Sequence, residues 1–320
     1  MKIVFFGTPE FAVPSLDRLV ADGHEIAAVV TMPDKIAGRG HKLIQSDVKK
    51  YAVKHGLKVM QPEKLKNPEF LAELQSLQAD LFVVIAFRML PEAVWAMPHN
   101  GTFNLHAALL PKYRGAAPIN RAIMNGETET GVTTFFLNHD IDTGSIIDRQ
   151  RIDILPEDNV GTVYDRLMVL GADMVSKTVR DIENGCVKPI PQPEGEFIPA
   201  PKIFKEDMAI HWDRPAAQIH NQVRGLSPYP AAYSALELLN HAPMDVKIYT
   251  TALTDEPSTG SDDNTGIVPG DVRIEKKRLL VATSDRWLEI VELQPAGKKR
   301  MAASAFLLGY TPLRFKAPAL

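Results

Sequence analysis

The stretch Asp80-Leu-Phe-Val-Val-Ile-Ala-Phe87 is the most apolar segment of the sequence and decides the fold class. Its apolar residues are continuous and do not alternate with polar ones, which is typical of a strand buried on both faces of a parallel sheet. Two further runs, Lys2–Phe6 and Glu25–Thr31, have the same character. Helical patterns separate the runs, so the first half is predicted to be a doubly wound, Rossmann-like α/β domain with a mostly parallel sheet. The other elements expected there are helices at Pro14–Val20, Ser46–His55 and Asn67–Leu77 and a short strand at Lys58–Met60.

The second half of the chain has a different pattern, in which turns separate short apolar runs. After one predicted helix, the expected strands are Val246–Leu253, Arg278–Ala282, Trp287–Leu293 and Ala302–Leu308. Short strands without intervening helices indicate a small barrel or sandwich. Five prolines between residues 189 and 201 exclude a helix and mark this segment as a linker. We therefore predict a catalytic domain over residues 1–188, a proline-rich linker over 189–205 and a second domain over 206–320.

Composition limits the classes of protein that the chain can represent. Its 320 residues carry 36 Lys and Arg against 39 Asp and Glu, a net charge of −3. That balance argues against a broadly basic nucleic-acid binder but does not exclude local basic patches. A single cysteine, Cys186, cannot form an internal disulfide, and the longest apolar run is far below the roughly 18 residues of a membrane span. No secretory signal is recognisable, so a cytoplasmic location without membrane contact is expected.

Asn104 and His106 are the strongest candidates for chemistry. They lie two residues apart in a predicted strand over Phe103–His106, so their side chains point to the same face. Ligands of doubly wound sheets bind beyond the carboxyl ends of the strands. There, an amide can stabilise a developing oxyanion and an imidazole can move a proton near neutral pH. Asp142, after another predicted strand at Gly131–Leu137, could orient the imidazole, and together these residues suggest acyl or one-carbon transfer.

The residues alone also allow purely structural roles for these side chains. Asn104 and His106 could simply bind neighbouring backbone, and Asp142-Thr-Gly144 could be an ordinary Asx turn. The sequence argues against three well-known kinds of site. Gly7-Thr-Pro-Glu10 lacks the dinucleotide-binding pattern, and neither a P-loop nor a serine-nucleophile motif occurs. No metal is expected either, since the possible ligands have no recognised spacing. These are His106, His139, Asp140 and Asp142.

A set of motifs covers nearly the whole chain. In the first half they are Phe5-Phe-Gly-Thr-Pro-Glu-Phe-Ala-Val-Pro14, Pro33-Asp-Lys-Ile-Ala-Gly-Arg-Gly40, Asn104-Leu-His-Ala-Ala-Leu-Leu-Pro111, Tyr113-Arg-Gly-Ala-Ala-Pro-Ile119 and Asp142-Thr-Gly144. In the second half they are Ala200-Pro-Lys-Ile203, Ile210-His-Trp212 and Ile219-His-Asn-Gln-Val-Arg-Gly-Leu-Ser-Pro-Tyr-Pro230. With them the sequence resembles the folate-dependent formyltransferases, and among these the methionyl-tRNA formyltransferase family. The Asn-x-His and Asp-x-Gly elements are common to all these enzymes and to formyl hydrolases, whereas the Arg-Gly-Ala-Ala-Pro and Arg-Gly-Leu-Ser-Pro-Tyr-Pro runs are narrower signals.

The resemblance implies a Rossmann-like formyltransferase domain followed by an OB-like barrel that binds tRNA. It also implies a formyl donor, 10-formyltetrahydrofolate, and an acceptor, the α-amine of methionyl initiator tRNA. Asn104, His106 and Asp142 then occupy the catalytic positions. The folate-contacting segment corresponds to Ala108, Leu109, Leu110 and Pro111, and the family usually has serine in place of Ala108. From their place at a strand end, we expect Phe87 and Leu90 to flank the pterin.

The tRNA is expected to meet local basic clusters. Residues 31–50 contain five Lys or Arg against two Asp, and the resemblance identifies Arg39 as the functional arginine of this loop. Two more clusters of basic residues lie in the second half and could contact tRNA phosphates. Surface lysines that serve only to keep the protein soluble would give the same sequence pattern. The candidate tRNA-binding residues are Lys35, Arg39, Lys42, Lys276, Lys277, Lys298 and Lys299. Resemblance favours a monomer. The alternatives are another folate-dependent formyltransferase or hydrolase, or a non-catalytic tRNA-binding protein.

Overall fold

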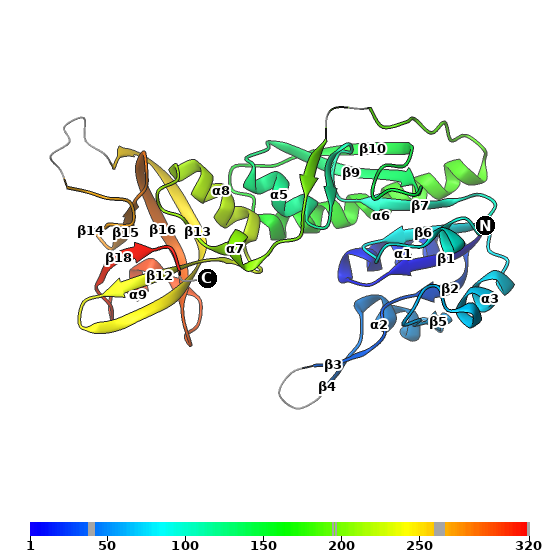
Figure 1. Ribbon diagram of the computed structural model, residues 1–320, viewed down its shortest axis with the longest axis horizontal. Coiled ribbons are helices and arrows are strands. Elements are labelled where there is room, and N and C mark those ends of the chain that lie inside the picture. Colours follow the sequence, from blue (N-terminus) through cyan, green and yellow to red (C-terminus); the bar gives the residue numbers. More distant parts are fainter. Residues whose placement is uncertain (38–41, 194, 196, 259–265, 319–320) are drawn as a thin grey trace. The chain divides into compact units, whose positions relative to one another are not determined.

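The computed structural model describes residues 1–37, 42–193, 195, 197–258 and 266–318, and it divides into two compact units (Figure 1). Unit 1 comprises Met1–Pro118, Glu129–Ile152 and Tyr164–Ala200. Unit 2 comprises Ile119–Thr128, Asp153–Val163 and Pro201–Leu320. Each unit has its own sheet and core, so each is described by itself.

Unit 1 is built on a seven-stranded sheet with the order β10-β9-β7-β6-β1-β2-β5. The pairs from β7 through β6, β1 and β2 to β5 are parallel, and β9 runs antiparallel to β7. This confirms the mostly parallel, Rossmann-like sheet predicted from the continuous apolar runs. The strands are β1 (Lys2–Gly7), β2 (Glu25–Val30), β5 (Val59–Met60), β6 (Leu81–Ile85), β7 (Thr102–His106), β9 (Glu129–Phe136) and β10 (Ile146–Asp153).

The central strands of unit 1 are buried on both faces. On one face, Val4 and Phe6 of β1 pack in a cluster with Phe70 and Leu74. Those two residues belong to α3 (Pro68–Ser76), which begins at an Asn67 cap. Such two-sided burial explains why β1 and β6 read as unbroken apolar runs. The remaining helical segments of this part of the chain are η1 (Glu10–Ala12), α1 (Val13–Ala21), α2 (Asp47–Lys54), α4 (Glu92–Trp95), α5 (Pro118–Met124) and α6 (Val160–Glu183). Of these, α5 after Pro118 and the start of α6 up to Val163 belong to unit 2.

Two small sheets complete unit 1. Strand β8 (Lys112–Gly115) pairs in parallel with β11 (Ile198–Ala200), which brings the proline-rich segment onto this unit. Strands β3 (Lys35–Ala37) and β4 (Lys42–Ile44) pair antiparallel as a hairpin.

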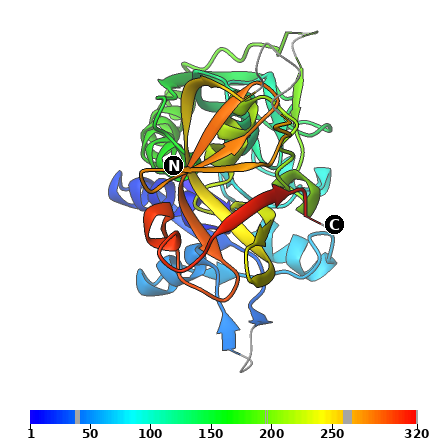
Figure 2. The same ribbon diagram turned by 90° about the vertical axis from the view of Figure 1, so that its left-hand side faces the viewer.

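Unit 2 contains an antiparallel sheet with the order β14-β15-β16-β13-β12-β18, and β17 pairs with β16. A bridge between Asp271 and Arg314 links the two ends of this order, so the sheet curls into a nearly closed barrel (Figure 2). This confirms the predicted barrel-like second half. The strands are β12 (Ala232–Leu238), β13 (His241–Pro257), β14 (Val272–Glu275), β15 (Arg278–Ala282), β16 (Arg286–Pro295), β17 (Met301–Ala302) and β18 (Pro312–Lys316). Its helices are α7 (Lys205–Met208), α8 (Ala216–Leu226) and α9 (Ala303–Phe306).

One strand predicted in the second half is wrong. Ala302–Leu308 does not form a strand, since its first residue ends β17 and Ala303–Phe306 forms the helix α9. Alanine is the best helix former, and the two buried side chains of α9, Ala303 and Phe306, are three residues apart on one helical face. An apolar run this short does not distinguish a strand from a buried helical turn.

Unit 2 also gathers two segments from the first half of the chain. Arg121 of α5 forms a bidentate ion pair with Asp207, with N–O distances of 2.9 and 3.0 Å. Arg224 of α8 donates to the carbonyl oxygens of Leu155 and Asp158, at 3.1 and 2.9 Å. None of the helices within the described residues is both long and apolar enough to cross a membrane.

Candidate active site

Asn104 and His106 lie on β7, between β6 and β9. The expected strand is present, and its register sets Asn104 beside Val84 on β6 and His106 opposite Thr133 on β9. His106 is 6% exposed and Asn104 is partly buried. Among the residues that the structure describes, the Asn104 amide has no hydrogen-bond partner. Its donors are therefore free to bind a ligand.

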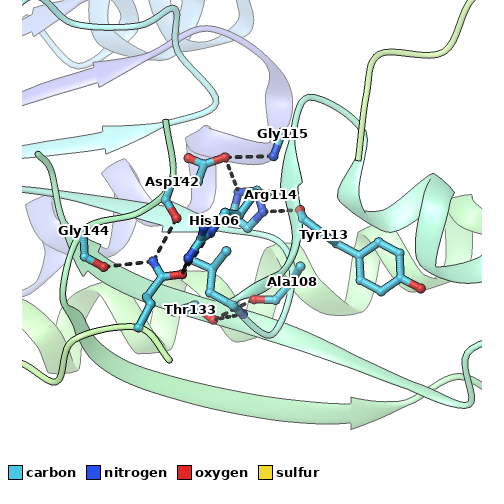
Figure 3. A network of polar contacts seen from close by, with 10 residues as sticks. His106, Ala108, Tyr113, Arg114, Gly115, Thr133, Asp142 and Gly144 are labelled. Carbon is cyan, nitrogen blue, oxygen red and sulfur yellow. Dashed lines mark hydrogen bonds and ion pairs between the residues drawn. The ribbon is translucent and has the colours of Figure 1, made fainter. Parts of the chain in front are cut away.

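Both ring nitrogens of His106 face acceptors (Figure 3). Nε2 lies 2.8 Å from the carbonyl oxygen of Tyr113, and Nδ1 lies 3.8 Å from Oδ2 of Asp142. A carbonyl oxygen only accepts, so Nε2 carries a proton and Nδ1 is the unprotonated nitrogen of the neutral ring. A proton taken up at Nδ1 would therefore face the carboxylate of Asp142.

The Asp142 carboxylate is also held by β8, through the same oxygen that faces His106. The backbone N–H of Gly115 donates to Oδ2 of Asp142 at 2.9 Å. Asp142 has a left-handed backbone with φ of 55°, which is uncommon for a residue other than glycine. Two residues later, a Cβ on Gly144 would lie 1.6 Å from the carbonyl oxygen of Phe136 in β9. The Asp-Thr-Gly turn is thus packed directly against the sheet.

Gln192, a residue that sequence reasoning missed, contacts this turn. Its Nε2 donates to the carbonyl oxygens of Asp142 and Gly144, at 2.8 and 2.9 Å. Its Oε1 accepts from Arg114, at 3.1 Å from Nε and 2.5 Å from Nη2. Gln192 lies in the proline-rich segment, 50 residues from Asp142, and no spacing or pattern connects the two positions.

The expected folate-contacting segment is fixed mainly through its backbone. The Thr133 hydroxyl donates to the carbonyl of Ala108 at 2.7 Å and accepts from the N–H of Leu110 at 3.1 Å. Arg149 donates to the carbonyl of Leu110 at 2.9 Å. The side chains of Ala108, Leu110 and Pro111 are buried, whereas Leu109 is partly exposed. Any ligand would therefore contact the backbone of this segment or Leu109.

Phe87 and Leu90 follow strand β6. Phe87 is partly buried, and its ring meets that of Phe6 edge-on at 5.7 Å. Leu90 is only 6% exposed and belongs to the core cluster of this face. Arg88 fixes the segment by donating to the backbone carbonyls of Pro62 and Glu63. Phe87 is therefore better placed than Leu90 to contact a ligand.

The basic loop of unit 1 is partly neutralised. Lys49 donates to Asp34 at 2.6 Å and Lys50 to Asp47 at 2.8 Å. The hydrogen bonds from Lys49 and then Gln61 lower the pKa of Asp34. Lys35 is exposed on β3. Arg39 and the side chain of Lys42 lie outside the residues that the structure describes.

The barrel lysines occupy two turns of unit 2, and all four are exposed. Leu279 pairs with Ile290, and Met301 pairs with Leu293. This register directs the turns before β15 and before β17 towards the same end of β16. Within the described part of the chain these lysines have no ion-pair partner, whereas Arg278 pairs with Glu289 and Arg300 with Glu292. The four are Lys276, Lys277, Lys298 and Lys299.

No three His, Cys, Asp or Glu side chains of the described segments are grouped as metal ligands would be.

Comparison with known proteins gives the family. Residues 1–179 match the formyl transferase family model, and residues 202–311 match the model of the formyl transferase C-terminal domain. A methionyl-tRNA formyltransferase of Bacteroides fragilis is 50% identical over 315 residues, covering 97% of this chain and 95% of that protein. The chain belongs to the methionyl-tRNA formyltransferase family. A further member, from Phocaeicola vulgatus, is 52% identical over 317 residues, covering 97% of this chain and 96% of its own.

Solved structures share the fold of this family. The N-formyltransferase from Helicobacter canadensis, in complex with folinic acid and dTDP-3-aminofucose, has a TM-score of 0.64 at 21% identity and covers 92% of this chain and 99% of its own. HypX from Aquifex aeolicus, in complex with tetrahydrofolic acid, has a TM-score of 0.61 at 17% identity. That match covers 96% of this chain and 47% of HypX.

Proposed function

We propose that this chain transfers the formyl group of 10-formyltetrahydrofolate to the α-amine of methionyl initiator tRNA. The observation that carries the proposal is the identity of about half the residues to methionyl-tRNA formyltransferases along 97% of the chain. The geometry around His106 supports the chemistry, because an unpartnered amide and an imidazole facing a carboxylate suit formyl transfer.

The reaction needs an oxyanion-stabilising donor. The amine attacks the formyl carbon, a C–N bond forms, and negative charge develops on the formyl oxygen. In the proposed mechanism the amide of Asn104 donates to this oxygen, and the ring of His106 adds positive charge once it has taken up the proton of the attacking amine. Removing one such donor typically lowers turnover about 10²–10³-fold. The intermediate then collapses as the bond between the formyl carbon and N10 breaks.

The reaction also moves one proton, from the attacking amine to N10 of the leaving folate. Nδ1 of His106 is the nitrogen open to a proton, because Nε2 already donates to the Tyr113 carbonyl. We assign Asp142 the role of stabilising the resulting imidazolium, 3.8 Å from Nδ1. Proton transfer by a positioned imidazole typically contributes about 10²–10⁴-fold in rate.

We assign folate binding to residues 108–111 and to Phe87. Ala108 is fully buried with its carbonyl bonded to Thr133, so the serine usual at this position is not needed to fix the backbone. Leu90, which packs in the core, would act by supporting Phe87.

We assign tRNA binding to Arg39, Lys35 and Lys42 in unit 1 and to the four lysines of the barrel turns in unit 2. Lysines without carboxylate partners can pair with phosphates without first breaking an ion pair, and each phosphate contact steepens the salt dependence of binding. We further propose that the chain works as a cytoplasmic monomer.

One assay tests the proposal. Purified protein is mixed with 10-formyltetrahydrofolate and charged methionyl initiator tRNA, and formylmethionyl-tRNA and free formate are both measured. The proposal predicts formyl transfer to the tRNA. Formate release without transfer would indicate a hydrolase, and tRNA binding without turnover would indicate a binding protein. Either result would contradict the proposal.

A further inference from the structure

We propose that Gln192 is a positioning residue, which fixes the turn that carries Asp142 so that its carboxylate stays against His106. This inference rests on the proposed function. It gives the proline-rich segment a part in the active site of unit 1 besides that of a linker.

Both ends of the Gln192 side-chain amide form hydrogen bonds. The NH₂ group has two hydrogens, and it donates to the carbonyl oxygens of Asp142 and Gly144 at 2.8 and 2.9 Å. These carbonyls lie on either side of Thr143, so one side chain spans the turn. A shift of Asp142 therefore has to stretch at least one of the two bonds.

The acceptor end of the same amide is bound to β8. Arg114 donates twice to Oε1 of Gln192, and its guanidinium also stacks 5.4 Å from the ring centroid of Phe197. The next residue, Gly115, donates its backbone N–H to the Asp142 carboxylate at 2.9 Å. Strand β8 thus holds the carboxylate of Asp142 directly through Gly115, and holds its backbone through Arg114 and Gln192.

Gln192 is itself anchored on both sides. Before it, Ile190 exchanges two backbone hydrogen bonds of 2.8 Å with Ile146, the first residue of β10. After it, β11 pairs with β8 at Pro199 and Ala200. The side chain therefore reaches the turn from a position two residues after an anchored one.

The turn needs such support because its own conformation is unfavourable. Asp142 has φ of 55°, a left-handed backbone that is uncommon for a residue other than glycine. The Nδ1–Oδ2 distance of 3.8 Å is already longer than a hydrogen bond, so a small outward shift would remove the ion pair. Misplacing a catalytic group by 1 Å can cost on the order of 10²-fold in rate.

Gln192→Glu removes the donor group of the side chain and keeps an acceptor, so it tests the two ends of the amide separately. A carboxylate at 192 can still accept from Arg114, but it has no hydrogen to donate to the carbonyls of Asp142 and Gly144. We expect kcat to fall about 10–100-fold while KM for folate and for tRNA stays within about twofold. Gln192→Ala should behave similarly. The matched control is Lys188→Ala, an exposed side chain immediately before this segment, which should keep wild-type kinetics.

A double-mutant cycle shows whether Gln192 acts through Asp142. In an Asp142→Asn background, Gln192→Ala should lower kcat less than twofold further, because residues that act as a unit are not additive. Wild-type kcat in both Gln192 variants, multiplying effects in the cycle, or unfolding of both variants by circular dichroism would overturn the inference. Wild-type protein is assayed in parallel, and its failure to transfer formyl groups would count against the proposed function itself.

Discussion

Gly144→Ala should disable the site without touching any catalytic side chain. The Cβ of an alanine at 144 would lie 1.6 Å from the carbonyl oxygen of Phe136, whereas such contacts essentially never fall below 3.0 Å. The turn must therefore move by about 1.4 Å away from β9, because the oxygen belongs to the backbone of a strand held between β10 and β7. Asp142 is two residues away and moves with the turn. Misplacement by 1 Å can cost on the order of 10²-fold, so we expect kcat to fall about 100-fold.

The assay is steady-state formyl transfer at saturating folate and tRNA, with thermal unfolding measured on the same samples. Overpacking typically costs about 1–3 kcal/mol, so Gly144→Ala should lower the melting temperature while leaving a folded protein. Gly309→Ala is the matched control, since a Cβ there has nothing within 4 Å, and it should leave kcat unchanged. Wild-type kcat in folded Gly144→Ala would refute the claim that the position of this turn governs the reaction.

Three further predictions concern stability and tRNA binding. Burial, and then the charge of Arg224, lower the pKa of His220 to about 4, so the unfolded chain with a pKa near 6.5 binds the proton first. The free energy of unfolding should thus be highest above about pH 7 and should fall between pH 6.5 and pH 4. Between pH 8 and pH 5.5, urea unfolding should show that wild type loses roughly 1 kcal/mol more of this free energy than His220→Gln does. Equal losses in the two proteins would contradict the assignment. Replacing the four barrel lysines by alanine should reduce the slope of log K against log salt for tRNA by roughly 0.7–0.9 for each phosphate that the variant no longer neutralises, and an unchanged slope would remove these lysines from the tRNA interface. Arg39→Ala should raise KM for tRNA more than KM for folate, and kinetics identical to wild type would refute its role.

Much of the sheet in unit 1 was predictable because a strand that is buried on both faces has apolar residues at consecutive positions. After a charged first residue in β1 and β2, strands β1, β2 and β6 carry consecutive apolar residues, a pattern typical of strands covered on both faces. In unit 2 the same reasoning failed at Ala302–Leu308, where a short apolar run fits a helical turn as well as a strand. The attachment of residues 119–128 and 153–163 to unit 2 depends on long-range contacts such as Arg121–Asp207, which leave no local pattern.

The site was predictable where it follows from strand geometry. Asn104 and His106 lie on one face of β7 because side chains alternate along a strand. The approach of Asp142 to His106 could only be guessed from its place after a predicted strand. Gln192 was not predictable, because its role depends on where an extended, proline-rich segment passes over the sheet. The Tyr113 carbonyl and the Gly115 N–H are backbone groups, and the identity of a residue says little about where such groups point.

The most direct test of the central claim is formyl transfer by wild type and by the Asn104→Ala/His106→Ala double variant under identical conditions. The measured quantity is formylmethionyl-tRNA formed from 10-formyltetrahydrofolate in a single turnover, with folding of both proteins checked by circular dichroism. We predict product with wild type and a rate at least about 10²–10³-fold lower with the folded double variant. A double variant that transfers at the wild-type rate would contradict the assignment of the chemistry to these residues.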